Sequence, residues 1–280
     1  MAIVDQWQKS FAQIVESLAP SGSDEVSRFW VLFVTGKSFG PGSWFWHQSF
    51  RHLYILHLLV LSGSQVEALS KLVRLIFNQA AMWLGAGGLV ATRAAWLRPC
   101  LTAVLLGFAA ATEWSAPITR ATLIAVAGLW TVRWNPLFLM ALAFVFQWLV
   151  FSEHQEQIGF YLSWIAYLVV VLMANLRVGR LASTAMVSTV LFLVVDTGYF
   201  DNPFSWRALT ICVAANLLFC GIFDLAFMPL AAVFIAMALV LATLGLAFGP
   251  KFLGTGDFLA LWTEPMVEAL LVVLKWLMYT

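Results

Sequence analysis

Apolar runs follow one another along most of this chain, from about residue 79 to residue 248, with short polar segments between them. Charged residues form 10% of the sequence, whereas ordinary soluble domains carry about 25%. A backbone inside a bilayer must satisfy its own hydrogen bonds, and about 20 apolar residues suffice for one helical span. The sequence therefore predicts an all-α fold, a polytopic integral membrane protein built from helices.

Three segments are expected along the chain. Residues 1–27 place apolar side chains at helical spacing opposite polar ones, which is typical of an amphipathic interfacial helix lying on a membrane. Residues 28–250 form the membrane domain, where runs such as 99–111 and 182–195 are too short to span comfortably and predict broken or re-entrant helices. Residues 251–280 contain a second amphipathic or membrane helix.

Charges in the loops of the C-terminal half alternate in sign. Arg133 lies in one loop, Glu153 and Glu156 lie in the next, and Arg177 and Arg180 lie in the one after. By the positive-inside rule, the loops that carry arginine face the cytoplasm. The formal net charge is +1, so no global basic field gathers a polyanion, and any contact with nucleic acid must be local.

A polar cluster interrupts the apolar segment HLLVLSGSQV at residues 57–66. Backbone freed by a Ser-Gly break at membrane depth is tolerated only where protein covers it or where it lines a wet cavity. We therefore expect a path or site here, lined by Ser62, Gly63 and Gln65. His57, in the same segment, is either a core histidine bonded to a carbonyl or a further lining group.

The spacing of histidine and serine disfavours a metal site or a hydrolase. His47, His52 and His57 are five residues apart, which on one helix rotates each by about 140° from the last and prevents a shared metal face. The same rotation separates His57 from Ser62, and no GxSxG elbow is present, so an intramembrane hydrolase stays only an alternative. We expect no enzyme activity, no metal and no cofactor.

Two further polar groups lie inside apolar runs. Arg120 follows Pro117 at the start of a run, where it is either a snorkelling side chain or an anion contact, and the helix dipole favours an anion there. Arg93 is a weaker candidate of the same kind. Asn216 and Asp224 are eight residues apart, near one helical face, and they either hydrogen-bond a neighbouring helix or line the path.

Five blocks, in order, resemble the membrane domain of the ComEC family of competence proteins. Residues 57–66 resemble its HLLAISGLHV block, and SAPITRA at 115–121 resembles its SPSxxRA helix start. Pro136 and IGFYLS at 158–163 are similar to its NP and VGFQLS blocks, and ANLL at 215–218 followed by Pro229 is similar to its ANLL…P block. The sequence departs at Gln65, where the family has histidine, and at Gly221, which replaces a proline.

The resemblance implies a multi-pass channel component of the bacterial cytoplasmic (inner) membrane that translocates single-stranded DNA into the cytoplasm during natural transformation. Full-length family members also carry an OB-type DNA-binding domain and a nuclease domain, which do not fit into these 280 residues. The expected partners are therefore single-stranded DNA, the lipid bilayer and separate DNA-binding, nuclease and ATPase proteins, and a homo-oligomer stays open. The alternative is a membrane transporter for another solute.

Overall fold

The fold was analysed in a computed structural model. It describes residues 2–18, 29, 31, 33–34, 63–83, 89–131, 134–195, 204–222, 225, 227–248, 268–269 and 272. These residues form helices and the turns between them, with no strand in these ranges. The all-α part of the fold prediction is therefore confirmed for the described residues.

The helices follow in chain order. They are α1 (Ala2–Leu18), α5 (Gly63–Trp83), α6 (Leu89–Ala111), α7 (Ala116–Trp130), α8 (Pro136–Val150), the short 3-10 helix η1 (Ser152–Glu156), α9 (Ile158–Asn175), α10 (Arg180–Phe192), α11 (Trp206–Ile222) and α12 (Met228–Phe248).

Proline and a polar cap define two of the helix starts. Pro136 is the first residue of α8, and Asn135 before it accepts a hydrogen bond from the Leu137 N–H at 2.9 Å. Pro117 lies in the first turn of α7. Proline suits this position because its fixed φ matches the helix and the missing N–H would have no partner there. These signals are why α7 begins beside Pro117, at the start of the run predicted there, and why α8 begins at Pro136.

One expected boundary is wrong. The run expected over residues 99–111 begins at Pro99, whereas α6 begins at Leu89 and continues through Pro99 as one helix. Proline inside a helix removes one hydrogen bond and crowds the carbonyl four residues earlier. Pro99 is exposed, so the ring lies away from the packed face of α6, and the helix continues past it.

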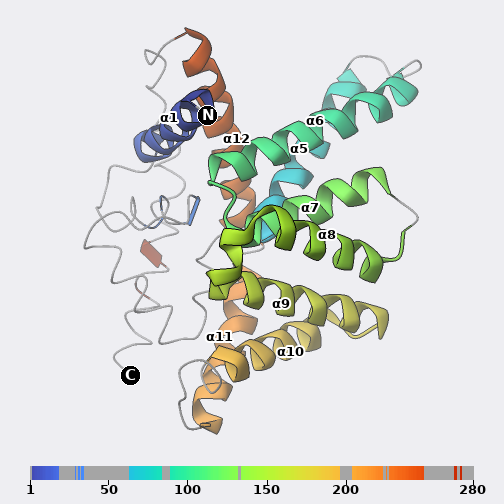
Figure 1. The fold of residues 1–280 in the computed structure, drawn as a ribbon, viewed down its shortest axis with the longest axis vertical. Coiled ribbons are helices and arrows are strands. Elements are labelled where there is room, and N and C mark those ends of the chain that lie inside the picture. The colour runs from blue at the N-terminus through green and yellow to red at the C-terminus, as the bar shows by residue number, and fades with distance from the viewer. Residues whose placement is uncertain are drawn as a thin grey trace.

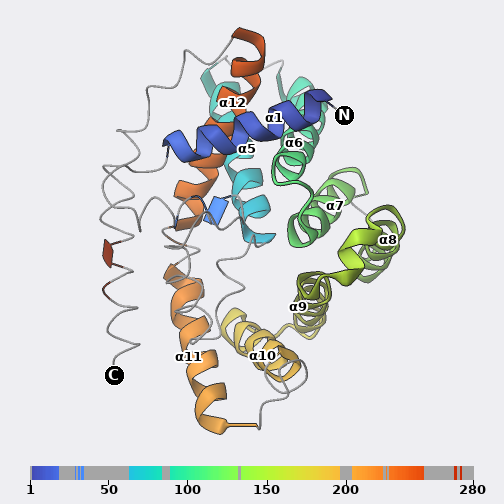
Figure 2. The same ribbon diagram turned by 60° about the vertical axis from the view of Figure 1, so that its left-hand side comes forward.

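Helix α5 lies at the centre of one half of the molecule and packs on α6, α7 and α12 (Figure 1). Helix α1 crosses α12 and α6 (Figure 2). Its apolar face is used within the protein, because Phe11, Ile14 and Val15 are buried in the main core, and the Gln8 side chain donates to the Ala110 carbonyl at 2.7 Å. The helical prediction for this segment is confirmed, and its interfacial placement stays a prediction.

A second, smaller core joins α7, α8 and α9. It consists of Ala116, Ala143, Phe160 and Trp164. Beyond it, α9 packs on α10 and α10 packs on α11, so the helices from α6 to α10 follow one another as a row (Figure 1). Short connections join each helix of the row to the next one in the chain. Consecutive helices joined in this way usually lie side by side.

Apolar side chains cover much of the outer surface of this row. On α8, Phe138, Leu142, Val145, Phe146 and Leu149 are all exposed. Helix α9 is long and apolar enough to cross a membrane. Helices α7, α8, α10 and α11 have 13 to 17 residues, fewer than the roughly 20 of one full span, as the expectation of broken or re-entrant segments requires. Helix α6 has 23 residues and α12 has 21, so the expected short run 99–111 is part of a longer helix.

The C-terminus of α9 yields a stability prediction. Arg177 has φ 56°, and two hydrogen bonds form a Schellman motif around it, from the Val178 N–H to the Met173 carbonyl (2.9 Å) and from the Arg177 N–H to the Ala174 carbonyl (3.0 Å). Glycine adopts this conformation without strain. Arg177→Gly should therefore raise the free energy of unfolding by about 1 kcal/mol. Arg177→Ala removes the same charge but keeps a Cβ, so denaturant unfolding of the two purified variants should differ, and equal stabilities would contradict the prediction.

Candidate functional site

Three of the sequence blocks meet at the Arg120 side chain. Arg120 lies on α7, and its Nη1 donates to the Ser163 carbonyl on α9 at 2.5 Å. Its guanidinium carbon lies 5.1 Å from the centre of the Tyr167 ring, a cation–π contact. On the opposite side, Nη2 faces the start of α5, where a Cβ added to Gly63 would lie 3.0 Å from it. The contacts place Gly63, Arg120 and Ser163 around one guanidinium.

The Arg120 guanidinium is buried and keeps hydrogen-bonding capacity. The residue is 8% exposed, and its Nε finds no hydrogen-bond partner in the described part of the chain. The hydroxyl of Ser163 beside it is also buried without a partner there. Buried polar groups are nearly always paired with protein, water or a ligand. A guanidinium with an unused N–H is the group that binds a phosphate or carboxylate oxygen most strongly.

Gly63 permits the close approach of α5 to α7. Besides its distance to Arg120, the added Cβ would lie 3.2 Å from the Cβ of Ala121. A side chain at position 63 would therefore push the two helices apart or displace the guanidinium. The Ser-Gly break predicted from the sequence thus serves helix contact at Gly63 in addition to any role on a path.

Gln65 points into the protein. It is fully buried, and its Nε2 donates to the carbonyl of Phe33. Its Oε1 has no partner among the described residues. The departure from the family histidine therefore places a neutral amide with one unused acceptor on the first turn of α5, where a histidine would bring a titratable ring.

Asn216 is also buried, on α11. Its Nδ2 donates to the Cys212 carbonyl at 2.9 Å within the same helix, and its Oδ1 lacks a partner in the described ranges. Its neighbours Ala215 and Phe219 belong to the main core. The polar face expected on this helix is present at Asn216, and it is turned inward.

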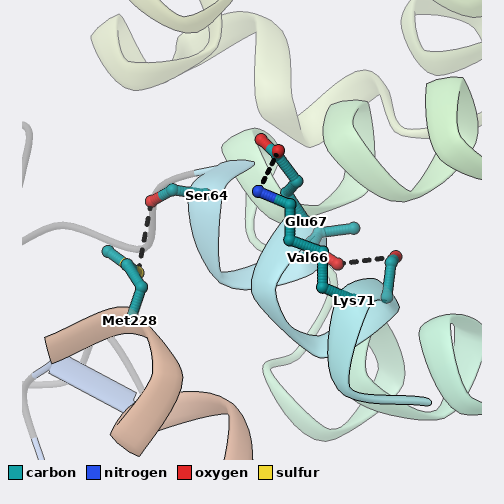
Figure 3. A network of polar contacts seen from close by, with 6 residues as sticks. Ser64, Val66, Glu67, Lys71 and Met228 are labelled. Atoms are coloured by element: carbon teal, nitrogen blue, oxygen red, sulfur yellow. Dashed lines mark hydrogen bonds and ion pairs between the residues drawn. The ribbon is translucent and has the colours of Figure 1, made fainter. Parts of the chain in front are cut away.

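A cleft of about 660 Å³ opens beside the first turns of α5. It lies between α5, α12 and the start of α10, and its polar lining consists of Ser64, Glu67, Lys71 and Arg180. Figure 3 shows Ser64 against Met228 of α12, with its Oγ 3.4 Å from the sulfur, and Glu67 paired with Lys71 at 2.7 Å. The remaining lining is mostly apolar, so the cleft combines two cations, one carboxylate and hydrocarbon surface.

Sequence reasoning missed two residues of this cleft, Lys71 and Arg180, as candidate site residues. A signal for Lys71 was present, because Ser64, Glu67 and Lys71 recur at helical spacing and therefore share one face of α5. Arg180 carried no such signal, since it reaches the cleft from a helix more than a hundred residues later in the chain.

Several predicted site residues cannot be placed in this geometry. His57, Ser62 and Asp224 lie outside the described residues, and Arg93 belongs to α6 although its side chain also lies outside them. Among the residues searched, no group of three metal-ligating side chains occurs. The structure therefore brings Gly63 and Arg120 together, with Gln65 on the same turn of α5 as Gly63 and Asn216 on a separate helix.

The close approach at Gly63 can be tested with a matched pair of glycines. Gly63→Ala should lower the free energy of unfolding by about 1–3 kcal/mol, because the added methyl overpacks the contact with Arg120 and Ala121. Gly128 on α7 has nothing within 4 Å of an added Cβ, so Gly128→Ala should raise stability by about 0.5–1 kcal/mol. Thermal unfolding of both variants in detergent measures the difference, and a Gly63→Ala protein as stable as Gly128→Ala would show that the contact is not tight.

Comparison with known proteins agrees with the blocks that form this site. The family described as Competence protein matches residues 43–279. Comparison with curated proteins and with solved structures gives no match. The matched range contains the helices from α5 to α12, and therefore Gly63, Arg120, Ser163 and the cleft beside them. Because the match covers far more than half of the sequence, the resemblance to ComEC proteins is confirmed, and the chain belongs to the competence protein family.

Proposed function

We propose that the protein forms part of the path by which single-stranded DNA crosses the bacterial cytoplasmic membrane during natural transformation. Membership of the family gives the chain a role in competence, the uptake of DNA. The observation that carries the finer proposal is the buried Arg120 guanidinium. Its Nε–H has no partner among the described residues, and it lies where three family-like blocks meet. Arginine binds phosphate oxygens through several N–H groups at once, and phosphates are the one feature that every DNA sequence presents.

The cleft beside α5 extends this chemistry toward the surface. Its described lining carries the cations Lys71 and Arg180 and the carboxylate of Glu67, which pairs with Lys71. Cationic side chains in a cleft attract a polyanion. Leu72, Leu75 and Val233 add apolar surface, which suits the flat faces of unpaired bases. Proteins that hold single strands without sequence preference combine a basic groove with aromatic side chains on which the bases stack. The described lining of this cleft supplies the cations and an aliphatic surface.

The exposed apolar surfaces support a position inside a bilayer. The outer faces of α8 and α9 are apolar, and α9 is long enough to cross a membrane. The alternating loop charges favour the cytoplasm for the loops with Arg133, Arg177 and Arg180. In this proposal the chain crosses the inner membrane several times, with its shorter helices as partial spans that meet at the polar path.

The proposal assigns no catalytic step and no cofactor to the chain. DNA binding outside the membrane, strand degradation and the energy of transport then come from separate DNA-binding, nuclease and ATPase proteins. A homo-oligomer is compatible with the same path, since subunits of a ring can share a channel.

Lys71 and Arg74 form a matched pair for testing the path. Both are exposed cations on α5, but only Lys71 lines the cleft. Lys71→Ala should lower DNA uptake several-fold and lower the salt dependence of single-stranded DNA binding by about 0.7 in the slope of log K against log salt, because one phosphate contact is lost. Arg74→Ala should change neither quantity. The measurements are uptake of labelled DNA in a deletion strain complemented with each variant, and binding to the purified protein at a series of salt concentrations.

Arg120 itself is tested by Arg120→Lys, which keeps the charge and loses the planar fork of donors. Loss of a charge-assisted hydrogen bond is worth about 1.5–3 kcal/mol, so uptake should fall about tenfold or more while the protein stays in the membrane fraction. Normal uptake by this variant would refute the phosphate contact. If uptake of DNA is normal while the flux of a small anion is lost, the chain is a transporter for another solute instead.

A further inference from the structure

A buried polar network joins the ends of α7, α8 and α9 on the side of the second core. At its centre is Gln147 of α8, which is fully buried. Its Nε2 donates to the Ala116 carbonyl at 2.9 Å and lies 3.0 Å from Nδ1 of His154. Its Oε1 accepts from Nε1 of Trp164 at 3.1 Å. One amide therefore ties together three helices and η1.

The partners of Gln147 determine the protonation state of His154. The Trp164 indole can only donate, so the amide oxygen must face it and the amide nitrogen must face the other two partners. One hydrogen of that nitrogen goes to the Ala116 carbonyl, and the other points at Nδ1 of His154. Nδ1 must therefore be an acceptor, which requires the neutral ring with its proton on Nε2.

The surroundings of His154 favour the neutral ring as well. His154 is 3% exposed, and its ring stacks on Phe151 with centroids 5.2 Å apart. Burial lowers the pKa of His154 below its ordinary value of about 6.5, and the nearby Glu153 and the Trp114 backbone oppose this only in part. The elements around it also carry Glu113, Glu156, Arg120, Tyr161 and Tyr167. Helix α8 itself carries no charged residue.

Protonation of His154 would break the network at its centre. A proton on Nδ1 would set an N–H against the NH₂ group of Gln147, two donors facing each other in a buried space. The amide would have to turn or withdraw, and its bond to Ala116 would be lost. The Ala116 carbonyl is also the helical acceptor for the backbone N–H of Arg120, four residues later. Two hydrogen bonds, through Gln147, thus join His154 to the turn that carries the Arg120 guanidinium.

The turn before α7 adds to this dependence. Glu113 and Trp114 both have φ 54°, in the left-handed region, so their conformation persists only because neighbouring groups hold it. The Trp114 N–H donates to the Ala109 carbonyl at 2.7 Å, and the Trp114 ring packs on Phe151 with centroids 5.5 Å apart. Phe151 is the same ring that stacks on His154, so η1 supports both the turn and the first residues of α7.

We infer that Gln147 and His154 form a proton-sensitive latch that fixes the first turn of α7, and with it the Arg120 site, while His154 is neutral. Above about pH 6.5 the His154 ring is neutral whether the latch is formed or broken, so the latch contributes fully to the stability of the first turn of α7. As the pH falls below that value, protein with a broken latch takes up the proton first, because the pKa of His154 is lower when the latch is formed. The latch therefore weakens until the pH reaches that lower pKa. By the loop charges, η1 faces away from the cytoplasm, where external acid reaches it.

The tautomer and the titration of His154 test the latch directly. The full chain has four histidines, so a sample labelled with ¹⁵N at histidine gives few resonances, and His154→Gln assigns the one that disappears. The expected result is an unprotonated Nδ1, a protonated Nε2 and a titration below pH 6.5. A proton on Nδ1, or a titration at or above 6.5, would overturn the latch. If His154→Gln does not fold, substitution of the other three histidines assigns the resonance by elimination.

Hydrogen exchange tests the effect on α7. Glutamine at position 154 keeps a donor and an acceptor but cannot titrate, which makes His154→Gln the matched control. After correction for the intrinsic rate, amide exchange in residues 116–120 should rise up to about tenfold in the native protein between pH 7.5 and 5.5, since one pH unit below 6.5 changes the proton-linked equilibrium at most about tenfold. It should stay constant in His154→Gln. An equal rise in both proteins, or no rise in either, would overturn the latch.

The link between the latch and DNA uptake rests on the proposed function. The experiments distinguish a failure of that function from a failure of the latch. The resonance and exchange measurements involve no DNA. With a working latch and a working path, DNA uptake should fall between external pH 7.5 and 5.5 with the native protein and not with His154→Gln. A rise in exchange without any difference in uptake between the two proteins would support the latch and refute the role of the Arg120 site in uptake.

Discussion

The close approach of α5 to α7 at Gly63 is the contact on which the rest of the arrangement depends. Helix α5 carries the main core through its packing on α6 and α12, whereas α7 carries the second core through its packing on α8 and α9. The two cores meet where Gly63 lies against Arg120 and Ala121. The guanidinium borders the space that a side chain at position 63 would occupy. The joint therefore buries a charged group at the end of a long hydrocarbon stem.

On α5, α7, α9 and α11, several buried polar atoms find no hydrogen-bond partner among the residues that the structure describes. They include Gln65 Oε1, Arg120 Nε, Thr122 Oγ1, Ser163 Oγ and Asn216 Oδ1. Each such group destabilises a dry interior by about 1–3 kcal/mol, so a protein that kept them all unpaired would lose a large part of its stability. A hydrated path between the helices would supply water as a partner for such groups.

The sequence predicts most helices of the C-terminal half because their ends carry local signals. Pro117, Asn135 with Pro136, and the charged loops after residues 151 and 176 each mark an end, and the observed helices agree within a few residues. At Pro99 the same rule fails, because a proline on the outer face of a helix removes one bond without disturbing the packed face.

The site could be predicted only as separate pieces. Arg120 and Ser163 are 43 residues apart in the chain, and no spacing rule joins residues at that separation. Gln147 is a polar residue inside an apolar run, which is a usable signal for a buried network, but its partners could be found only from the fold.

The Gly63 contact also limits how sequences of this kind can change. A side chain at position 63 would share the space at the joint with the side chains of Arg120 and Ala121. A larger residue at position 63 requires a smaller residue at 121 or a shorter one at 120, and either exchange alone leaves a clash or a cavity. The three positions should therefore covary across related chains as one unit, although they belong to two blocks that are separate in the sequence. An alignment of related chains would then place the joint without a structure.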